Sequence, residues 1–506
     1  MSIRITGMNS GLDTDSMVKE LVSAYNKKAD IYRGNQKKLQ WKQDAWKELN
    51  TKVKNFVSKS VSNMRFSTNY MKKKTTSSNS SVASVVTSDN AVNGRQTLKV
   101  TKLAQTGYLT GGELKLADDK KVTGSTKLSE LGYSGAENIT LKMKDGRTQE
   151  IDLNDGDITV NEFVSRVNGA FEKGGVNASF DGSTGRIFIS SVESGADNDF
   201  EFVGNTDALK SLGLTIGTGE NAGNDGTAKK LDGSNAEIIL NGVKYENNTN
   251  TISVNGLTIT ANSVSDDEVV LATETDYDSI YGNIKSFLTE YNSLIKQFDT
   301  LYNADSADKY SMLTNEEKEV MSDDEVEDWE NKIKSALLRR DSNVATISST
   351  MRETMLKTYT IADKTYSLAS FGISTPEYLL AAENEKNMYH IDGDPDDADT
   401  AGQPDKLKAA IAADPNAVAG FFQALSNDLY EKMNELSRSS DYRSYGNFYD
   451  DKQIQKEYDD WTTKISDYED YVADMEEKYY KQFTRMEKAM GEMQSQQTYI
   501  SQLMGG

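Results

Sequence analysis

Residues 458–503, YDDWTTKISDYEDYVADMEEKYYKQFTRMEKAMGEMQSQQTYISQL, contain the pattern that decides the fold. Every seventh residue from the first is apolar: Tyr458, Ile465, Val472, Tyr479, Met486, Met493 and Ile500. An interleaved row reads Trp461, Tyr468, Met475, Gln482, Ala489, Gln496 and Leu503. This 3.5-residue period predicts a coiled-coil helix from about residue 451 to 503. A helix of that length spans about 80 Å, so it needs partners along its surface.

A second heptad pattern lies near the other end of the chain. Its two rows are Val18, Tyr25, Tyr32, Leu39, Trp46, Val53 and Leu21, Lys28, Asn35, Lys42, Leu49, Phe56. Residues 16–74 hold 15 Lys or Arg against four acids, a net charge of +11, whereas residues 450–477 hold 11 acids against three lysines, a net charge of −8. Opposite charges attract, although salt screens exposed groups beyond about 10 Å. The two helices are therefore predicted to pair, within one chain or between copies.

Composition excludes several classes of function. The chain of 506 residues has no cysteine, which rules out disulfides, thiolate metal sites and a cysteine nucleophile. A single histidine, His390, rules out sites with several histidine ligands, and we expect it to be an ordinary surface residue. Carboxylates are abundant, but no pair is singled out by spacing or motif. We therefore expect no catalytic residues, no cofactor and no metal.

Charge and hydropathy exclude two kinds of partner. A net charge of −22 repels phosphate, so no nucleic acid is expected. No run approaches the roughly 20 apolar residues that span a bilayer, so no membrane insertion is expected. The first eight residues hold one arginine and no apolar run, which does not fit a cleavable signal peptide.

The middle of the chain has the composition of β structure. Residues 75–81 are predicted as a polar linker, and residues 82–275 as β-rich domains with short alternating runs. Asn241-Gly242 and Asn255-Gly256 each separate two apolar alternations, which predicts tight hairpins. Thr159 and Glu162 form a capping box before an apolar helical face, and Gly174-Gly175 is expected to end that helix before a hairpin.

Helical periodicity returns after residue 276. The acidic run 323–325 fits a helix N-terminus. Asp392, Asp394 and Asp396 loosely resemble a calcium loop, but Asp397 stands where glycine is needed, so no calcium is expected there. The predicted fold class is α+β and multidomain, with a long coiled-coil stalk from both chain ends and inserted β-rich domains. Its parts are a flexible segment (1–15), a stalk helix (16–74), the linker (75–81), the β domains (82–275), a helical domain packing with the N-terminal helix (276–445) and the C-terminal coiled coil (446–506).

Several motifs together carry a family resemblance. They are SGLDTDSMVKEL at residues 10–21, with Gly11, Leu12, Asp13, Thr14 and Asp15 as its signature; WKEL at 46–49; FGI at 371–373; and DPNAVAGFF at 414–422. These motifs resemble the bacterial flagellar filament-capping family, flagellar hook-associated protein 2. Residues 158–191 resemble the flagellin hook IN motif. There are departures: the proline often found early in the family's first coil is replaced by Lys27-Lys28-Ala29, and residues 303–341 match poorly.

The resemblance implies a structural assembly factor rather than an enzyme. Such caps are exported through the flagellum without a cleaved signal, which implies the export apparatus and an export chaperone as partners. They form a ring-like homo-oligomer, a pentamer or hexamer, at the extracellular tip of the filament, where they help flagellin insert and prevent its leakage. The predicted self-assembly residues are the apolar members of the four heptad rows other than Val18 and Ala489. They are Leu21, Tyr25, Tyr32, Leu39, Trp46, Leu49, Val53, Phe56, Tyr458, Trp461, Ile465, Tyr468, Val472, Met475, Tyr479, Met486, Met493, Ile500 and Leu503. A hook–filament junction or flagellin-like axial protein is the alternative, and an added adhesin role stays open.

Overall fold

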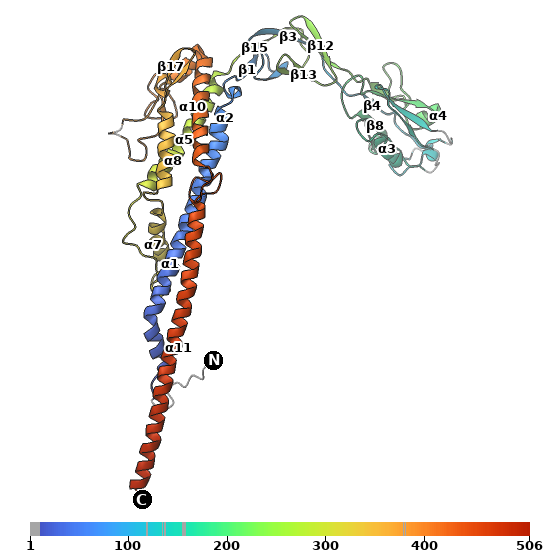
Figure 1. Ribbon diagram of the computed structural model, residues 1–506. Coiled ribbons are helices and arrows are strands. Elements are labelled where there is room, and N and C mark those ends of the chain that lie inside the picture. Colours follow the sequence, from blue (N-terminus) through green and yellow to red (C-terminus); the bar gives the residue numbers. More distant parts are fainter. Residues whose placement is uncertain are drawn as a thin grey trace. The chain divides into compact units, whose positions relative to one another are not determined.

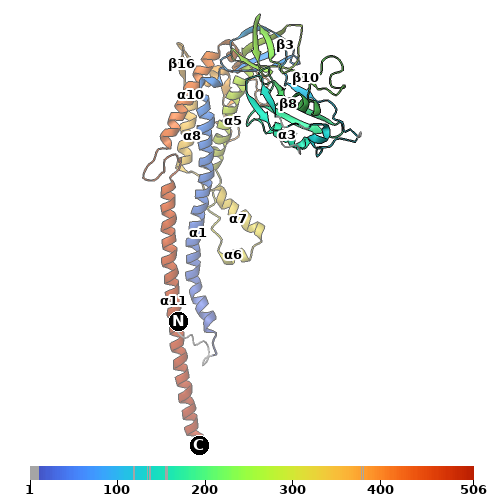
Figure 2. The ribbon, with the colours of Figure 1, turned by 90° about the vertical axis from the view of Figure 1, so that its right-hand side faces the viewer.

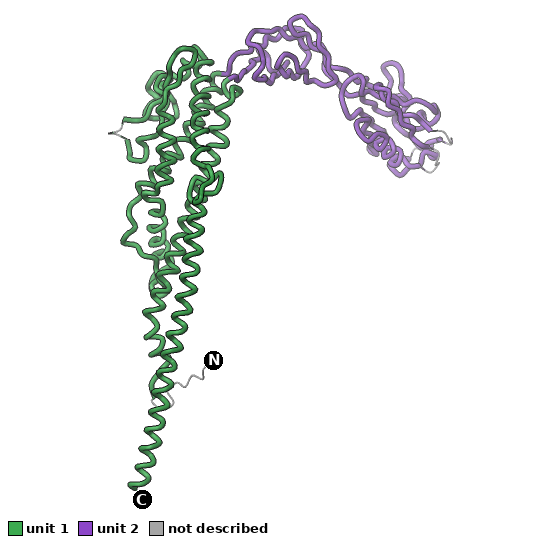
Figure 3. The backbone as a smooth tube through the Cα atoms, viewed as in Figure 1, with its two compact units in different colours: residues 1–70, 277–506 green, residues 71–276 purple. Residues whose placement is uncertain are grey.

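The computed structural model describes residues 11–505 except 118–119, 134, 136–137, 154–157, 378 and 380. The chain divides into two compact units (Figure 3). Unit 1 combines residues 1–70 with 277–506, and unit 2 is the continuous stretch 71–276. Mixed helices and small sheets confirm the α+β class. Of the segment expected to be flexible, residues 1–10 lie outside the described residues, and Thr14 and Asp15 already belong to a helix.

Unit 1 is mainly helical. Its helices are α1 (Thr14–Asn55), a π-helical turn (Phe56–Val61), α2 (Ser62–Met64), α5 (Tyr277–Tyr302), α6 (Asn315–Glu319), α7 (Asp323–Ser335), α8 (Ser342–Met355), α9 (Lys406–Ala413), α10 (Pro415–Leu436) and α11 (Asp451–Met504). Two small hairpin-like pairs complete it: β16 (Tyr359–Ile361) with β17 (Lys364–Tyr366), and β18 (Ile373–Ser374) with β19 (His390–Ile391). The acidic run at 323–325 is confirmed as a helix N-terminus, since it forms the first turn of α7.

The two long terminal helices α1 and α11 lie side by side (Figures 1 and 2). They run antiparallel, because Tyr25 near the start of α1 contacts Tyr471, whereas Trp46 further along α1 contacts Tyr449 just before α11. Above this two-helix stalk, the C-terminal part of α1, its π-helical turn, α5, α8 and α10 share one large apolar core. Phe56 of the π-helical turn stacks on Phe287 of α5 there, with ring centroids 5.8 Å apart.

Unit 2 is built mainly of strands. They are β1 (Lys73–Ser77), β2 (Ala83–Thr87), β3 (Gly94–Lys102), β4 (Tyr108–Thr110), β5 (Ile139–Met143), β6 (Thr148–Ile151), β7 (Val176–Asp181), β8 (Arg186–Ser191), β9 (Phe200–Gly204), β10 (Lys229–Leu231), β11 (Ala236–Leu240), β12 (Val243–Asn247), β13 (Thr251–Val254), β14 (Leu257–Ala261) and β15 (Val269–Thr275), with helices α3 (Val160–Asn168) and α4 (Thr206–Ser211). The sheets have the orders β1-β15-β3-β11-β12, β10-β4-β8-β7, β13-β14-β2 and β6-β5-β9. Two separate apolar cores lie beneath these sheets.

The local predictions in unit 2 are largely confirmed. Asn241 and Asn255 both adopt positive φ, and the pairs Leu240–Val243 and Val254–Leu257 close two-residue hairpin loops. The capping box of α3 is present, and hydrogen bonds from Thr159 lower the pKa of Glu162. The helix itself was predicted too long. It ends at Asn168, and Gly169 caps it through a bond to the Ser165 carbonyl.

The N-terminal helix is shorter than expected. It ends at Met64, and residues 73–77, partly expected in the helix and partly in the linker, form strand β1. The physical reason is long-range pairing: β1 pairs along its whole length with β15, and the hydroxyls of Thr75 and Thr273 bond at 2.8 Å. Among the described residues, no helix is long and apolar enough to cross a membrane.

Candidate assembly surface

The seam between α1 and α11 is aromatic. Tyr25 meets Tyr471 with ring centroids 5.9 Å apart, and Tyr32 lies between Trp461 at 5.7 Å and Tyr468 at 5.3 Å. Edge-to-face pairs of this kind contribute about 0.5–1.5 kcal/mol each beyond the area they bury. Aromatic side chains therefore make much of the contact between α1 and α11, in addition to the aliphatic heptad residues.

Most predicted self-assembly residues point into the chain's own interior. Leu49, Val53 and Phe56 are buried in the core of unit 1, and Trp46 stacks on Tyr449 at 5.3 Å. The half-buried residues along the seam are Tyr25, Tyr32, Leu39, Tyr458, Trp461, Ile465, Tyr468, Val472, Met475, Tyr479 and Met486. These residues thus stabilise the fold of a single chain, whether or not they also contact other copies.

Leu21 does not lie in the seam. Its side chain is 44% exposed, whereas the neighbouring Val22 is 4% exposed and packs with Val18 and Tyr480. A turn of 3.6 residues places positions 18, 22, 25 and 29 on one face, so Leu21 lies beside that face. The heptad rows did not include Val22, Tyr449 or Tyr471. Of these, Val22 was predictable, because Val18, Val22 and Ala29 are spaced at helical intervals.

The far end of α11 has no helix beside it in the described part of the chain. Met493, Ile500 and Leu503 are 62%, 54% and 66% exposed, and α11 continues past the first turn of α1 (Figure 1). A row of large apolar side chains on one bare helix face is typical of a docking surface.

The opposite charges of the two helices are mostly not paired with each other. Within the described residues a single ion pair joins α1 and α11, Arg33 to Glu469 at 2.5 Å, and this bond raises the pKa of Arg33. Lys464 instead lies over the rings of Tyr32 and Trp461, at 5.3 and 4.8 Å from their centroids. Cation–π contacts at such sites contribute about 0.5–1 kcal/mol.

The segment between α5 and α8 binds two lysines of α1. Lys37 contacts Glu330 of α7 at 3.4 Å, and Lys42 contacts Asp341 at 3.1 Å. Asp341 also lies 3.3 Å from the indole nitrogen of Trp46. Part of the positive charge of α1 is thus neutralised inside the chain by a segment that the heptad rows did not include.

The signature at residues 11–15 starts the stalk helix. Gly11 adopts a φ of +69°, a left-handed conformation that favours glycine. The carboxylate of Asp13 accepts the Ser16 backbone N–H at 3.0 Å and the Ser16 hydroxyl at 2.6 Å, which lowers the pKa of Asp13. Leu12 is exposed, and Thr14 and Asp15 form the first turn of α1. The motif is a helix N-cap.

His390 is more enclosed than expected. It is half-buried, because its Nδ1 bonds Asp397 at 2.5 Å across the loop that follows β19. Asp394 and Asp396 both bond the Lys285 ammonium at 2.6 Å, so these two carboxylates already share a cation within the chain. Burial opposes the charge of Lys285, but these two bonds raise its pKa overall.

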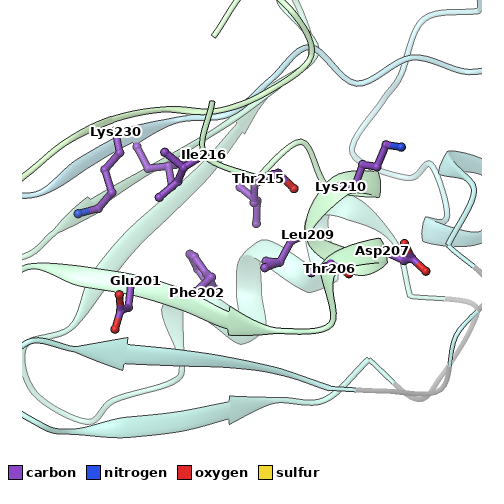
Figure 4. A pocket seen from close by; sticks show the side chains of 11 residues that line it. Glu201, Phe202, Thr206, Asp207, Leu209, Lys210, Thr215, Ile216 and Lys230 are labelled. Carbon is purple, nitrogen blue, oxygen red and sulfur yellow. The ribbon is translucent and has the colours of Figure 1, made fainter. Parts of the chain in front are cut away.

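Unit 2 has a hollow of about 420 Å³ between β9, β10 and α4 (Figure 4). Phe202, Leu209 and Ile216 form its apolar wall. Its buried cation, Lys230, already bonds both carboxylate oxygens of Asp199, at 2.7 and 2.8 Å. Glu201, Asp207 and Lys210 also line the hollow, so its wall is apolar only in part.

Comparison with known proteins gives one consistent family. Residues 10–107 match the model of the flagellar hook-associated protein 2 N-terminus, and residues 233–495, more than half of the chain, match that of its C-terminus. Flagellar hook-associated protein 2 of Halalkalibacterium halodurans is 23% identical over 99% of each chain. The protein of the same name from Escherichia coli K12 is 24% identical over 99% of this chain and 98% of its own.

A solved structure shares the fold. The crystal structure of the D1-D2-D3 domains of the flagellar cap protein FliD from Escherichia coli aligns with a TM-score of 0.52 at 22% identity, covering 82% of this chain and 99% of its own. The resemblance seen in the sequence is thereby confirmed. The chain belongs to the flagellar hook-associated protein 2 family, the family of the flagellar cap proteins.

Proposed function

We propose that this chain forms the cap at the distal tip of a bacterial flagellar filament. It acts there as a ring-like homo-oligomer of five or six copies, promotes flagellin folding and insertion, and keeps flagellin from leaking away. The observation that carries the proposal, beside family membership, is the stalk. Both chain ends build a two-helix rod whose last turns present an apolar face with no helix beside it in the described residues.

We assign different roles in the cap to the end of α11 and to unit 2. The exposed row of Met493, Ile500 and Leu503 would dock against helices of the filament tip. Complete burial of three such side chains contributes about 1.5–3 kcal/mol for each side chain, which would hold the end of the stalk against the filament. Unit 2, which contains the hollow, would form the plate of the ring.

The role is mechanical, and we infer no catalytic residues, cofactor or metal. The chain would reach the outside of the cell through the flagellar export apparatus, with an export chaperone and without a cleaved signal. The absence of cysteine and the count of four prolines suit a chain that is exported unfolded, because prolyl isomerisation takes tens of seconds.

A cellular experiment tests this function. Cells that lack the gene should release unpolymerised flagellin into the medium and carry short or absent filaments. Adding the purified protein to such cells should restore filament growth, and the same protein lacking residues 491–506 should not. Filaments of normal length in cells without the gene would contradict the proposal.

A further inference from the structure

The hollow of unit 2 lies between the outer strands of two sheets. The sheet β6-β5-β9 ends at β9, and the sheet β10-β4-β8-β7 ends at β10. Residues 214–216, which follow α4, lie against the outer side of β10, where Ile216 forms a single parallel bridge with Ala228. Phe202 of β9 and Ile216 line the hollow from opposite sides (Figure 4).

The outer edge of β9 turns backbone groups away from its own sheet. The Lys144 N–H of the neighbouring strand donates to the Asp199 carbonyl at 2.8 Å. Successive residues of a strand direct their N–H and C=O groups to opposite sides, so Glu201 and Val203 also face β5, and those groups of Phe202 face away from it. Among the described residues, these two groups of Phe202 have no backbone partner.

The opposite side of the hollow has the same feature. The Ala228 N–H donates to the Thr215 carbonyl at 2.7 Å, and the Gly217 N–H donates to the Ala228 carbonyl at 2.9 Å. In such a parallel bridge the residue between the two, Ile216, directs its own N–H and C=O away from β10. These groups lie on the side where the hollow separates Ile216 from β9.

An extended polypeptide has the chemistry that this hollow lacks. A strand inserted there would bond Phe202 on one side and Ile216 on the other, and its apolar side chains would contact the wall that these two residues form with Leu209. Lys230, the buried cation of the hollow, is already bonded by Asp199, so it is not available to select a small anion. Backbone hydrogen bonds do not depend on side-chain identity, so the hollow suits segments of varied sequence.

We propose that this hollow binds an extended segment of unfolded flagellin as an added β-strand between β9 and residues 214–216. The inference rests on the proposed function, because a cap that promotes flagellin folding meets flagellin before it has folded. Open strand edges attract other extended chains, and proteins generally cover them. Here the site offers only a few backbone groups beside an apolar wall, so the bound segment is released easily as flagellin folds.

Photocrosslinking tests the site directly, because the chain has no cysteine to give a background. Lys210→Cys at the mouth of the hollow is labelled with benzophenone maleimide, which leaves the apolar wall intact. The full-length protein is mixed with flagellin diluted from denaturant and irradiated at once, and mass spectrometry identifies the captured segment. Lys173→Cys is the matched control, since Lys173 is also an exposed lysine of unit 2 but does not line the hollow. We expect about tenfold more captured flagellin at residue 210 than at residue 173.

Backbone methylation separates strand addition from apolar contact alone. The captured segment is synthesised as a peptide, with and without methyl groups on its backbone nitrogens, and each form competes with flagellin for crosslinking. Methylation removes the N–H donors and keeps every side chain, so it should weaken competition about tenfold. This arm changes only the peptide, so it does not depend on whether a variant protein folds.

The outcomes separate the strand site from the proposed function. Equal capture at residues 210 and 173, or competition that methylation leaves unchanged, would overturn the strand site. Capture of segments of this chain in place of flagellin would overturn flagellin as the occupant. If electron microscopy still shows rings at filament ends in these cases, the proposed function stands. A folded protein that neither forms rings nor captures flagellin would contradict both.

Discussion

Trp46 is the clearest place to test how the stalk joins the core of unit 1. Its side chain is 1% exposed, stacks on Tyr449 with ring planes 4° apart, and approaches Asp341 with its indole nitrogen. Trp46→Ala removes the stack and leaves a cavity at the point where the chain enters α11. Large-to-small changes of this kind cost about 3–5 kcal/mol. A loss of about 4 kcal/mol lowers the Tm of a unit this large by roughly 6 °C.

Tryptophan fluorescence is the suitable assay, because Trp41, Trp46, Trp329 and Trp461 all lie in unit 1. Emission during thermal unfolding therefore reports that unit alone, and calorimetry should show the transition of unit 2 unchanged. Trp41→Ala is the control on the same helix. That ring is half-buried between Lys37 and Lys334, so we expect a loss of only about 1 kcal/mol. Equal effects of the two variants, or a shift in both units, would refute this reasoning.

Three further predictions follow from the same contacts. The fragment 71–276 should fold alone with dispersed amide NMR signals, and the fragment 82–275 should melt at a lower temperature because it lacks β1 and leaves β15 paired only with β3; equal melting would contradict the role of β1. Deleting residues 491–506 should leave the Tm nearly unchanged, because Met493, Ile500 and Leu503 are exposed, and a large drop would show that they support the chain's own fold. Millimolar calcium should leave the Tm of unit 1 unchanged, because Lys285 holds Asp394 and Asp396, whereas a rise of several degrees would show that calcium displaces the lysine.

Local chemistry made part of the fold predictable. Asn241-Gly242 and Asn255-Gly256 specify tight turns by themselves, and the capping box at Thr159 specifies a helix start by itself. The heptad rows were sufficient to predict long terminal helices, since a 3.5-residue period sustained over many turns is typical of a coiled-coil helix. These features need no knowledge of distant residues.

Features that depend on distant residues were not predictable. Strand β1 is polar and short, and only its pairing with β15, about 200 residues away, makes it a strand. Leu21 was assigned to the seam because the first turns of α1 carry two overlapping stripes, and only the position of α11 shows that Val22 is the inner one. The charge balance predicted that the two helices pair, but not what joins them: tyrosine and tryptophan rings occupy most of the seam, and Arg33–Glu469 is the ion pair between the helices among the described residues.

Electron microscopy of the purified protein mixed with short flagellar filaments tests the cap function most directly. We predict closed rings of a single symmetry in the free protein, and one such ring seated at only one end of each filament. The protein lacking residues 491–506 should form the same rings and leave the filament ends bare. Open fibres of this chain, or rings that never bind a filament end, would contradict the claim that it is the filament cap.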